Sequence, residues 1–231
     1  MLAAFVAAGI NAVAGGGTFL TFPTLTGIGG LSEKVANMTS AIGLWPGSAA
    51  SVVAAREDLK RVPRSMVLGY GLISLIGGTA GSLLLIHTSA ATFRLIIPWL
   101  LAFATVIFAF SKPIARWAGR KHGDRSLKWA LIVAGAQLLV AVYGGYFGAG
   151  IGVLMLAGLS LTGLESVHQM NALKVLLGTC INGVAAILFL LNPLTNLPLA
   201  GAMAAAATVG GFAGMGLARR LPAQRLRLLI I

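Results

Sequence analysis

Charged residues are scarce in this sequence, and acidic residues are the scarcest of them. Only 10% of the 231 residues are charged, and Asp and Glu together number 5. A soluble domain carries about 25% charged residues, so this chain cannot build a surface that faces water throughout. The 58% share of hydrophobic residues and the mean hydropathy of +0.92 point the same way. Most of the surface is therefore expected to face lipid.

The few acids and the single cysteine exclude several kinds of site. All acids (Glu33, Glu57, Asp58, Asp124 and Glu165) lie in predicted loops, so no carboxylate is expected within a span to bind Na⁺ or relay protons. This favours an anion or a neutral polar substrate over a cation. Cys180 alone forms neither an internal disulfide nor a metal cluster. The zinc-protease and nucleophile-elbow motifs are also missing. We therefore predict that the protein has no catalytic residue, no metal and no cofactor, and that it is not an enzyme.

Long uncharged runs supply segments for several membrane crossings. A transmembrane helix needs about 20 mostly apolar residues. A membrane β-barrel needs short alternating segments, whereas these runs are continuous, so an all-α polytopic membrane protein is expected. The N-terminus lacks the basic region of a cleaved signal peptide. The runs are 1–32, 35–55, 65–93, 95–111, 129–164 and 175–218, the last divided by the turn-rich stretch 192–198.

Basic residues give a formal net charge of +12, and their positions indicate topology. Of the 17 Lys and Arg residues, 14 lie in the segments 56–64, 112–128 and 219–227, between apolar runs. This is the positive-inside pattern, so these loops are expected on the cytoplasmic side of the cell inner (cytoplasmic) membrane. The partner implied is the lipid bilayer and not nucleic acid. Assembly into a homo-oligomer is left open by the sequence.

A weak internal repeat relates two halves of the chain at a shift of 134 residues. Gly16 falls on Gly150 and Asn37 on Asn171, and the register holds without a gap from residue 6 to 77. We place membrane repeat 1 at residues 1–111, a cytoplasmic basic linker at 112–128 and membrane repeat 2 at 129–231.

The charge bias of equivalent loops changes sides between the halves. The loop 56–64 holds four basic residues and its partner 192–198 none, whereas 87–94 holds one and its partner 219–227 four. The halves are therefore expected to be inverted-topology repeats, as in many secondary transporters.

The side of the membrane assigned to each basic loop constrains where the glycine-rich segments begin and end. Both ends of the run 129–164 fall on the cytoplasmic side, so its 36 residues form either two short crossings or a re-entrant hairpin that turns near Gly144–Gly152. The first-half copy would bend near Gly15–Gly17. We favour opposed, glycine-broken hairpins that meet near the midplane, each followed by three transmembrane helices. After Arg227 only residues 228–231 remain, whereas the first-half counterpart continues over 95–111, so repeat 2 is expected to be C-terminally incomplete.

The glycine clusters are the first candidate substrate-binding segments. Consecutive glycines break a helix, and in lipid such irregular backbone survives only where it lines protein or a watery cavity. A broken helix points a positive N-terminus at its ligand, which suits an anion. Close helix packing through small residues is the alternative, strongest for Gly148 and Gly152. The candidates here are Asn11, Gly15, Gly16, Gly17 and Thr18 in the first cluster, and Gly148, Gly150 and Gly152 in the second.

Polar residues after each cluster complete the predicted site. Asn37 and Asn171 each head a predicted helix, where they either cap the helix or bind substrate. Lys174 is the one charge set back from a segment end, and it either binds the anion or extends to the cytoplasmic interface. The candidates from these helices are Asn37, Thr39, Ser40, Asn171, Lys174 and Asn182, with Ser48 equivalent to Asn182.

These motifs resemble the TauE/SafE sulfite exporter family, also called TSUP. The resemblance rests on the glycine cluster, Pro23 and the following ANMTS within Gly9 to Glu57, and on the stretch 144–191 as a second repeat. It implies a bacterial inner-membrane permease that exports sulfite, sulfonates or related small anions by alternating access. Ala157 stands where the first repeat has Pro23, and Ile151 interrupts the second glycine run.

Other functions stay open at this stage. A membrane scaffold or assembly factor would use the same helices without transport, and a carrier of a neutral solute or a metal would use the same architecture. An intramembrane enzyme would need a nucleophile, a metal cluster or an acid–base pair, none of which the motifs supply.

Overall fold

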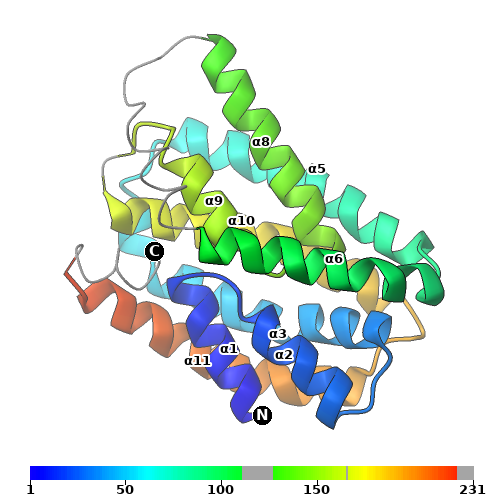
Figure 1. Ribbon diagram of the computed structural model, residues 1–231. Coiled ribbons are helices and arrows are strands. Elements are labelled where there is room, and N and C mark those ends of the chain that lie inside the picture. Colours follow the sequence, from blue (N-terminus) through cyan, green and yellow to red (C-terminus); the bar gives the residue numbers. More distant parts are fainter. Residues whose placement is uncertain (111–126, 165, 223–231) are drawn as a thin grey trace.

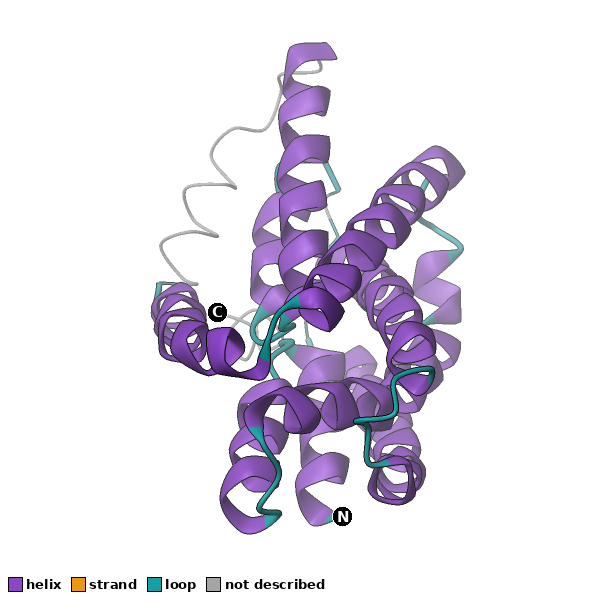
Figure 2. Cartoon of the chain, turned by 90° about the vertical axis from the view of Figure 1, so that its right-hand side faces the viewer, coloured by secondary structure: helices purple, strands orange, loops and turns teal. Residues whose placement is uncertain are grey.

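The computed structural model describes residues 1–110, 127–164 and 166–222, and every regular element in these ranges is a helix (Figure 2). The predicted basic linker 112–128 lies outside the described residues apart from 127 and 128. Glu165, Arg225 and Arg227 also lie outside them.

Each half of the chain begins with a helix, a glycine break and a shorter helix, and long helices follow (Figure 1). The first half comprises α1 (Leu2–Val13), α2 (Thr18–Pro23), a π-helix η1 (Thr24–Ile28), α3 (Glu33–Ala54), α4 (Arg56–Leu59), α5 (Arg64–His87) and α6 (Ala90–Ala109). The second comprises α8 (Leu127–Tyr146), α9 (Ile151–Leu159), α10 (Val167–Leu190) and α11 (Leu197–Arg220).

The helices have the length and surface of membrane-spanning segments. Within the described residues, α5, α10 and α11 are each 24 residues long and apolar enough to cross a bilayer. Large apolar side chains stand exposed, including Leu68, Trp99 and Leu139, each more than 70% accessible. Patches of this kind are not sustained by water-soluble monomers. The chain is therefore an all-helical, multi-pass membrane protein, as the uncharged runs predict.

Both predicted breaks are present. The first lies between α1 and α2 and the second between α8 and α9, and at each the chain turns back on itself (Figure 1). Gly15, Gly148 and Gly150 have φ values of 78°, 81° and 75°. These left-handed conformations are costly for any residue with a Cβ, which explains why glycine occupies the turns.

The two halves interlock instead of packing as separate units. α11 from the second half packs on α1 and α3 from the first, and α5 from the first half packs on α8 and α10 from the second. These two sets of contacts correspond to each other under the 134-residue shift. The central helices α3 and α10 also pack on each other, so each half completes the core of the other.

Close backbone approach between α3 and α11 makes glycine essential at that contact. A Cβ added to Gly211 would lie 2.0 Å from the carbonyl oxygen of Gly47. Ser51 Oγ also donates a hydrogen bond to the Gly211 carbonyl oxygen at 2.9 Å. Contacts between small residues and interhelical hydrogen bonds are the main forces that join helices in lipid.

We therefore expect Gly211→Ala to destabilise the folded protein by about 1–3 kcal/mol, because overpacking displaces α11 from α3. Gly216→Ala, on the same helix and with no atom within 4 Å of the new Cβ, is the matched control and should be neutral or stabilising. Thermal unfolding in detergent measures both. Equal melting temperatures for the two variants would contradict the assigned contact.

Two predicted helix starts are wrong. α3 begins at Glu33 after the N-cap Ser32, and α10 begins at Val167 after Ser166. Asn37 and Asn171 therefore lie more than one turn inside their helices, which rules out the capping interpretation for both. The predicted cytoplasmic loop 56–64 also contains one short helix, α4.

Candidate functional site

A cavity lies where the two glycine breaks meet the central helices α3 and α10. Its volume is about 50 Å³, several times the roughly 10–15 Å³ that one water molecule requires. Its polar lining residues are Asn11, Thr18, Asn37, Ser48, Ser51, Lys174 and Asn182. Its other lining residues are Ala12, Gly15, Ala41, Leu44, Gly144, Gly145, Phe147, Gly148, Ile151, Gly152, Met155, Val175, Gly178, Ala185 and Phe189.

The two halves contribute equivalent positions to this cavity. Several lining residues come in pairs that differ by 134 in number: Asn11 and Gly145, Thr18 and Gly152, Ala41 and Val175, Leu44 and Gly178, Ser48 and Asn182, and Ser51 and Ala185. Since both members of each pair line it, the cavity lies between the two halves. In transporters built from repeats, the substrate site lies at this interface.

Eight of the fourteen predicted site residues line the cavity: Asn11, Gly15, Thr18, Asn37, Gly148, Gly152, Lys174 and Asn182. The other six, Gly16, Gly17, Thr39, Ser40, Gly150 and Asn171, do not line it.

The turns of the two hairpins touch beside the cavity. A Cβ built on Gly15 would lie 2.4 Å from the Cα of Gly152, and one built on Gly152 would lie 2.6 Å from the Cα of Gly15. Since no side chain fits between them, the backbones are in direct contact.

Backbone N–H groups of the first turn already have an acceptor. Asn11 Oδ1 accepts hydrogen bonds from the Gly16 and Gly17 amides at 2.9 and 2.6 Å. This carboxamide thus supports the turn while its residue lines the cavity. In the second turn, Gly150 precedes the first residue of α9 and faces Phe19 and Ala104.

Asn37 and Asn171 make reciprocal hydrogen bonds across the two halves. Asn37 Nδ2 donates to the Tyr146 carbonyl oxygen at 3.0 Å, and Asn171 Nδ2 donates to the Ala12 carbonyl oxygen at 3.1 Å. Both donors and both acceptors are related by the 134-residue shift. Each central helix therefore binds a free carbonyl at the end of the other half's first hairpin helix, where an unpaired C=O is costly.

Thr39 and Ser40 hold α3 to its neighbours. Ser40 Oγ and Thr21 Oγ1 lie 2.6 Å apart and share a hydrogen bond, which joins α3 to α2. Thr39 Oγ1 accepts a hydrogen bond from the Asn196 amide at 3.3 Å, beside the first residue of α11. Both hydroxyls are buried.

Lys174 places an ammonium group at the cavity wall. Its Nζ donates to the carbonyl oxygens of Asn11, Ala12 and Val13 at 3.0, 3.4 and 3.2 Å. These carbonyls end α1, where the helix dipole is negative. The side chain is 3% exposed, so it does not extend to the interface as the alternative interpretation required. No Asp or Glu lines the cavity among the described residues.

Lys34 makes a similar contact away from the cavity. Its Nζ donates to the carbonyl oxygens of Ile86 and Thr88 at 2.9 and 2.7 Å, at the end of α5. The chain therefore uses a buried lysine twice to satisfy the end of a helix, but only Lys174 does so beside the cavity.

The aromatic side chain of Phe147, which the motifs did not predict as a site residue, contributes to the cavity wall. Its ring packs edge-to-face on Phe22 and Phe93, at centroid distances of 5.5 and 6.4 Å. The second glycine cluster contains Phe147, so the sequence carried part of this signal. Phe22 and Phe93 come from other elements and could be assigned only from the structure.

The cavity is thus small, has amide, hydroxyl and ammonium groups, and has no carboxylate in its described lining. Charge-assisted hydrogen bonds from such donors are strongest to anions. This donor set can hold a small oxyanion without a metal ion.

The whole chain matches a known protein family. The family model described as sulfite exporter TauE/SafE matches residues 1–231. No curated protein and no solved structure gives a significant match to the chain.

Proposed function

The chain belongs to the TauE/SafE sulfite exporter family, a family of membrane transporters, and from that premise we propose that it carries small sulfur-containing anions across the cytoplasmic membrane. Sulfite, sulfonates and related oxyanions are the proposed substrates, and outward transport is the proposed direction.

The observation that carries this proposal is the cavity that holds the Lys174 ammonium without a described carboxylate beside it. A cation in a low-dielectric site attracts an anion far more strongly than it would in water. The side chain of Asn182 makes no hydrogen bond within the described residues, and Ser48 Oγ donates only a long bond of 3.4 Å to the Leu44 carbonyl oxygen. We assign their polar groups to the substrate, with Lys174 supplying the charge.

We also propose that the two halves are inverted repeats whose hairpins enter the membrane from opposite faces. α9 has 9 residues and so is about 14 Å long, whereas the hydrocarbon core is about 30 Å thick. α2 and η1, with 6 and 5 residues, are similarly short. The second helical segment of each hairpin is thus too short to cross the bilayer alone, which supports re-entrant hairpins over two full crossings. The swapped charge bias supports their opposite orientation and a cytoplasmic position for the loops 56–64, 112–128 and 219–227.

Alternating access then follows from the contact between the hairpins. Gly15 and Gly152 meet beside the cavity, and Asn171 and Lys174 bind carbonyls at the end of α1. We propose that an anion reaching the cavity attracts the Lys174 ammonium away from these carbonyls. The loosened α1 break then shifts against the α9 break and exposes the site to one side at a time.

Flux of radiolabelled sulfite into proteoliposomes tests this function. We expect uptake well above that of protein-free vesicles, competition by unlabelled sulfite, and no dependence on added divalent metal. Folded, monodisperse protein that gives no flux would favour a scaffold or assembly factor. Flux of a neutral solute or a metal ion, with no flux of sulfite, would favour the other carrier functions.

A further inference from the structure

A second, separate groove lies at the ends of α3, α4 and α5. Its volume is about 760 Å³, much larger than the central cavity. Its lining combines two chemical classes: the apolar side chains Val52, Val53, Leu59, Val62, Val67 and Leu68, and the basic side chains Arg56, Lys60 and Arg64. None of the described lining residues is acidic.

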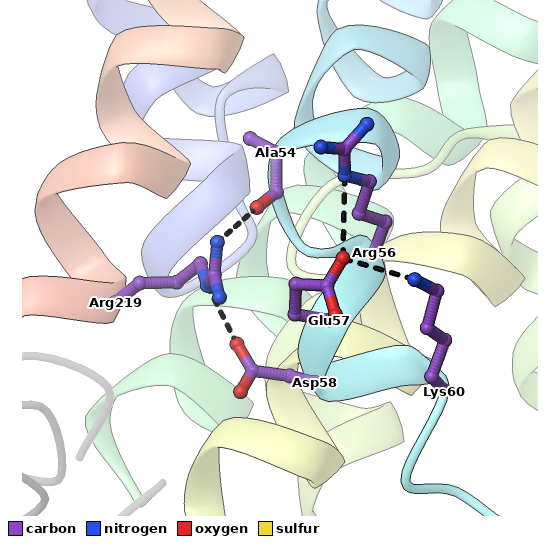
Figure 3. Close-up of polar contacts among 6 residues, drawn as sticks. All are labelled: Ala54, Arg56, Glu57, Asp58, Lys60 and Arg219. Atoms are coloured by element: carbon purple, nitrogen blue, oxygen red, sulfur yellow. Dashed lines mark hydrogen bonds and ion pairs between the residues drawn. The ribbon is translucent and has the colours of Figure 1, made fainter.

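The neighbouring acidic residues neutralise only part of the positive charge that lines the groove. Asp58 accepts a hydrogen bond from Arg219 Nε at 2.8 Å, and Arg219 Nη1 donates to the Ala54 carbonyl oxygen at 2.8 Å, so this carboxylate faces α11 (Figure 3). Glu57 lies 3.5 Å from Arg56 Nε and 3.0 Å from Lys60 Nζ. The Lys60 ammonium lowers the pKa of the Glu57 carboxyl below its usual value.

Of the three cations, Arg56 and Lys60 thus share the Glu57 carboxylate. Arg64 makes no ion pair within the described residues and is the first residue of α5. The positive end of this helix therefore adds to the charge of its guanidinium.

The apolar part of the groove lies at the level of the bilayer. α5 begins at Arg64 and is long and apolar enough to span the membrane, so Val67 and Leu68, about one turn into this helix, are expected to face the hydrocarbon layer. Leu68 is 73% exposed and Val53 57% exposed. The basic residues stand at the adjoining membrane surface. An occupant that satisfies both parts needs an anionic headgroup and hydrocarbon chains.

We propose that this groove is a binding site for one anionic phospholipid. Arg56, Lys60 and Arg64 bind the phosphate, and the acyl chains pack along Val53, Val67 and Leu68. Basic pockets at the membrane surface are suited to anionic lipid headgroups. A free phosphate would use the cations but leave the aliphatic walls exposed. The site does not depend on the proposed transport function.

Thermal unfolding of the purified protein in detergent tests this site. Phosphatidylglycerol should raise the Tm by about 3 °C or more over phosphatidylcholine with the same acyl chains. Native mass spectrometry should show retained phosphatidylglycerol. The triple variant Arg56→Gln/Lys60→Gln/Arg64→Gln should lose both effects. Arg94→Gln removes an exposed arginine that pairs with Glu33 elsewhere, and it should retain them.

The single variant Arg64→Gln breaks no described ion pair, so it tests the site even if the triple variant does not fold. It should weaken the preference for phosphatidylglycerol. Three results would overturn the proposal: equal stabilisation by the two lipids, an equal shift with inorganic phosphate alone, or an undiminished lipid preference in Arg64→Gln and in a folded triple variant. None of these results bears on sulfite flux, so failure here is distinguishable from failure of the proposed transport.

Discussion

We expect the substitution Lys174→Gln to reduce sulfite flux in proteoliposomes by roughly 10- to 100-fold. Hydrogen bonds to a charged group contribute about 1.5–3 kcal/mol, and each 1.4 kcal/mol corresponds to a factor of ten in binding. Gln keeps the approximate length and two N–H donors of the side chain but removes the charge. The lost flux therefore reports the attraction between the ammonium and the anion.

Lys34→Gln is the matched control for this variant. Lys34 is also buried and also binds carbonyls at a helix end, but it does not line the cavity. Both substitutions should lower the melting temperature by similar amounts, because each weakens the end of one helix. Only Lys174→Gln should reduce flux per folded molecule. Normal flux in Lys174→Gln would show that this lysine only stabilises the end of α1.

The second large effect is expected at the contact between the hairpins. Gly152→Ala should reduce flux by about tenfold or more, because its new Cβ would lie 2.6 Å from the Gly15 Cα. Neither backbone can yield without displacing its turn, and overpacking of this kind costs about 1–3 kcal/mol. The displaced turns would no longer close beside the cavity.

Gly158→Ala distinguishes this effect from a general response of α9 to substitution. It lies on the same helix, and nothing lies within 4 Å of its new Cβ. An exposed Gly→Ala change in a helix is neutral or stabilises by about 0.5–1 kcal/mol. Flux should therefore stay near the unsubstituted level. Equal flux in the two variants would show that the contact between the hairpins plays no part in transport. It would also favour the scaffold function, which predicts that alanine is tolerated in the glycine clusters.

The sequence predicted the features that depend on local chemistry. The three consecutive glycines at 15–17 and the closely spaced glycines around Gly150 strongly disfavour a helix, so both breaks were predictable. The turn-rich stretch 192–198 also ends α10 and precedes α11 as predicted. The register of 134 residues identified Ser48 and Asn182 as equivalent before their shared cavity was known.

Features that depend on tertiary contacts were not predictable. Asn37 and Asn171 resembled helix caps because caps and buried amides use the same residue type. Only the Tyr146 and Ala12 carbonyls, far away in sequence, distinguish the two roles. Asn11 was predicted to bind substrate directly, but the structure also gives its carboxamide the Gly16 and Gly17 amides as partners. The lipid-facing groove likewise depends on how α3, α4 and α5 meet.

The interlocking of the two halves affects both the stability of each half and the coupling between the two sides of the cavity. Since α11 packs on α1 and α3, and α5 on α8 and α10, neither half has a complete set of helix partners by itself. Separate expression of either half should therefore yield a poorly packed product. The same interlocking connects each hairpin to helices of the other half, which couples the two sides of the cavity.

Locating a bound anion tests the central claim most directly. Selenite has the shape and charge of sulfite, and selenium can be identified by its anomalous X-ray scattering. Crystals of the protein soaked in selenite should give one strong selenium peak in the cavity, within hydrogen-bonding distance of Lys174 or Asn182. A peak elsewhere together with an empty cavity, or a metal ion between the two glycine turns, would contradict an anion site there.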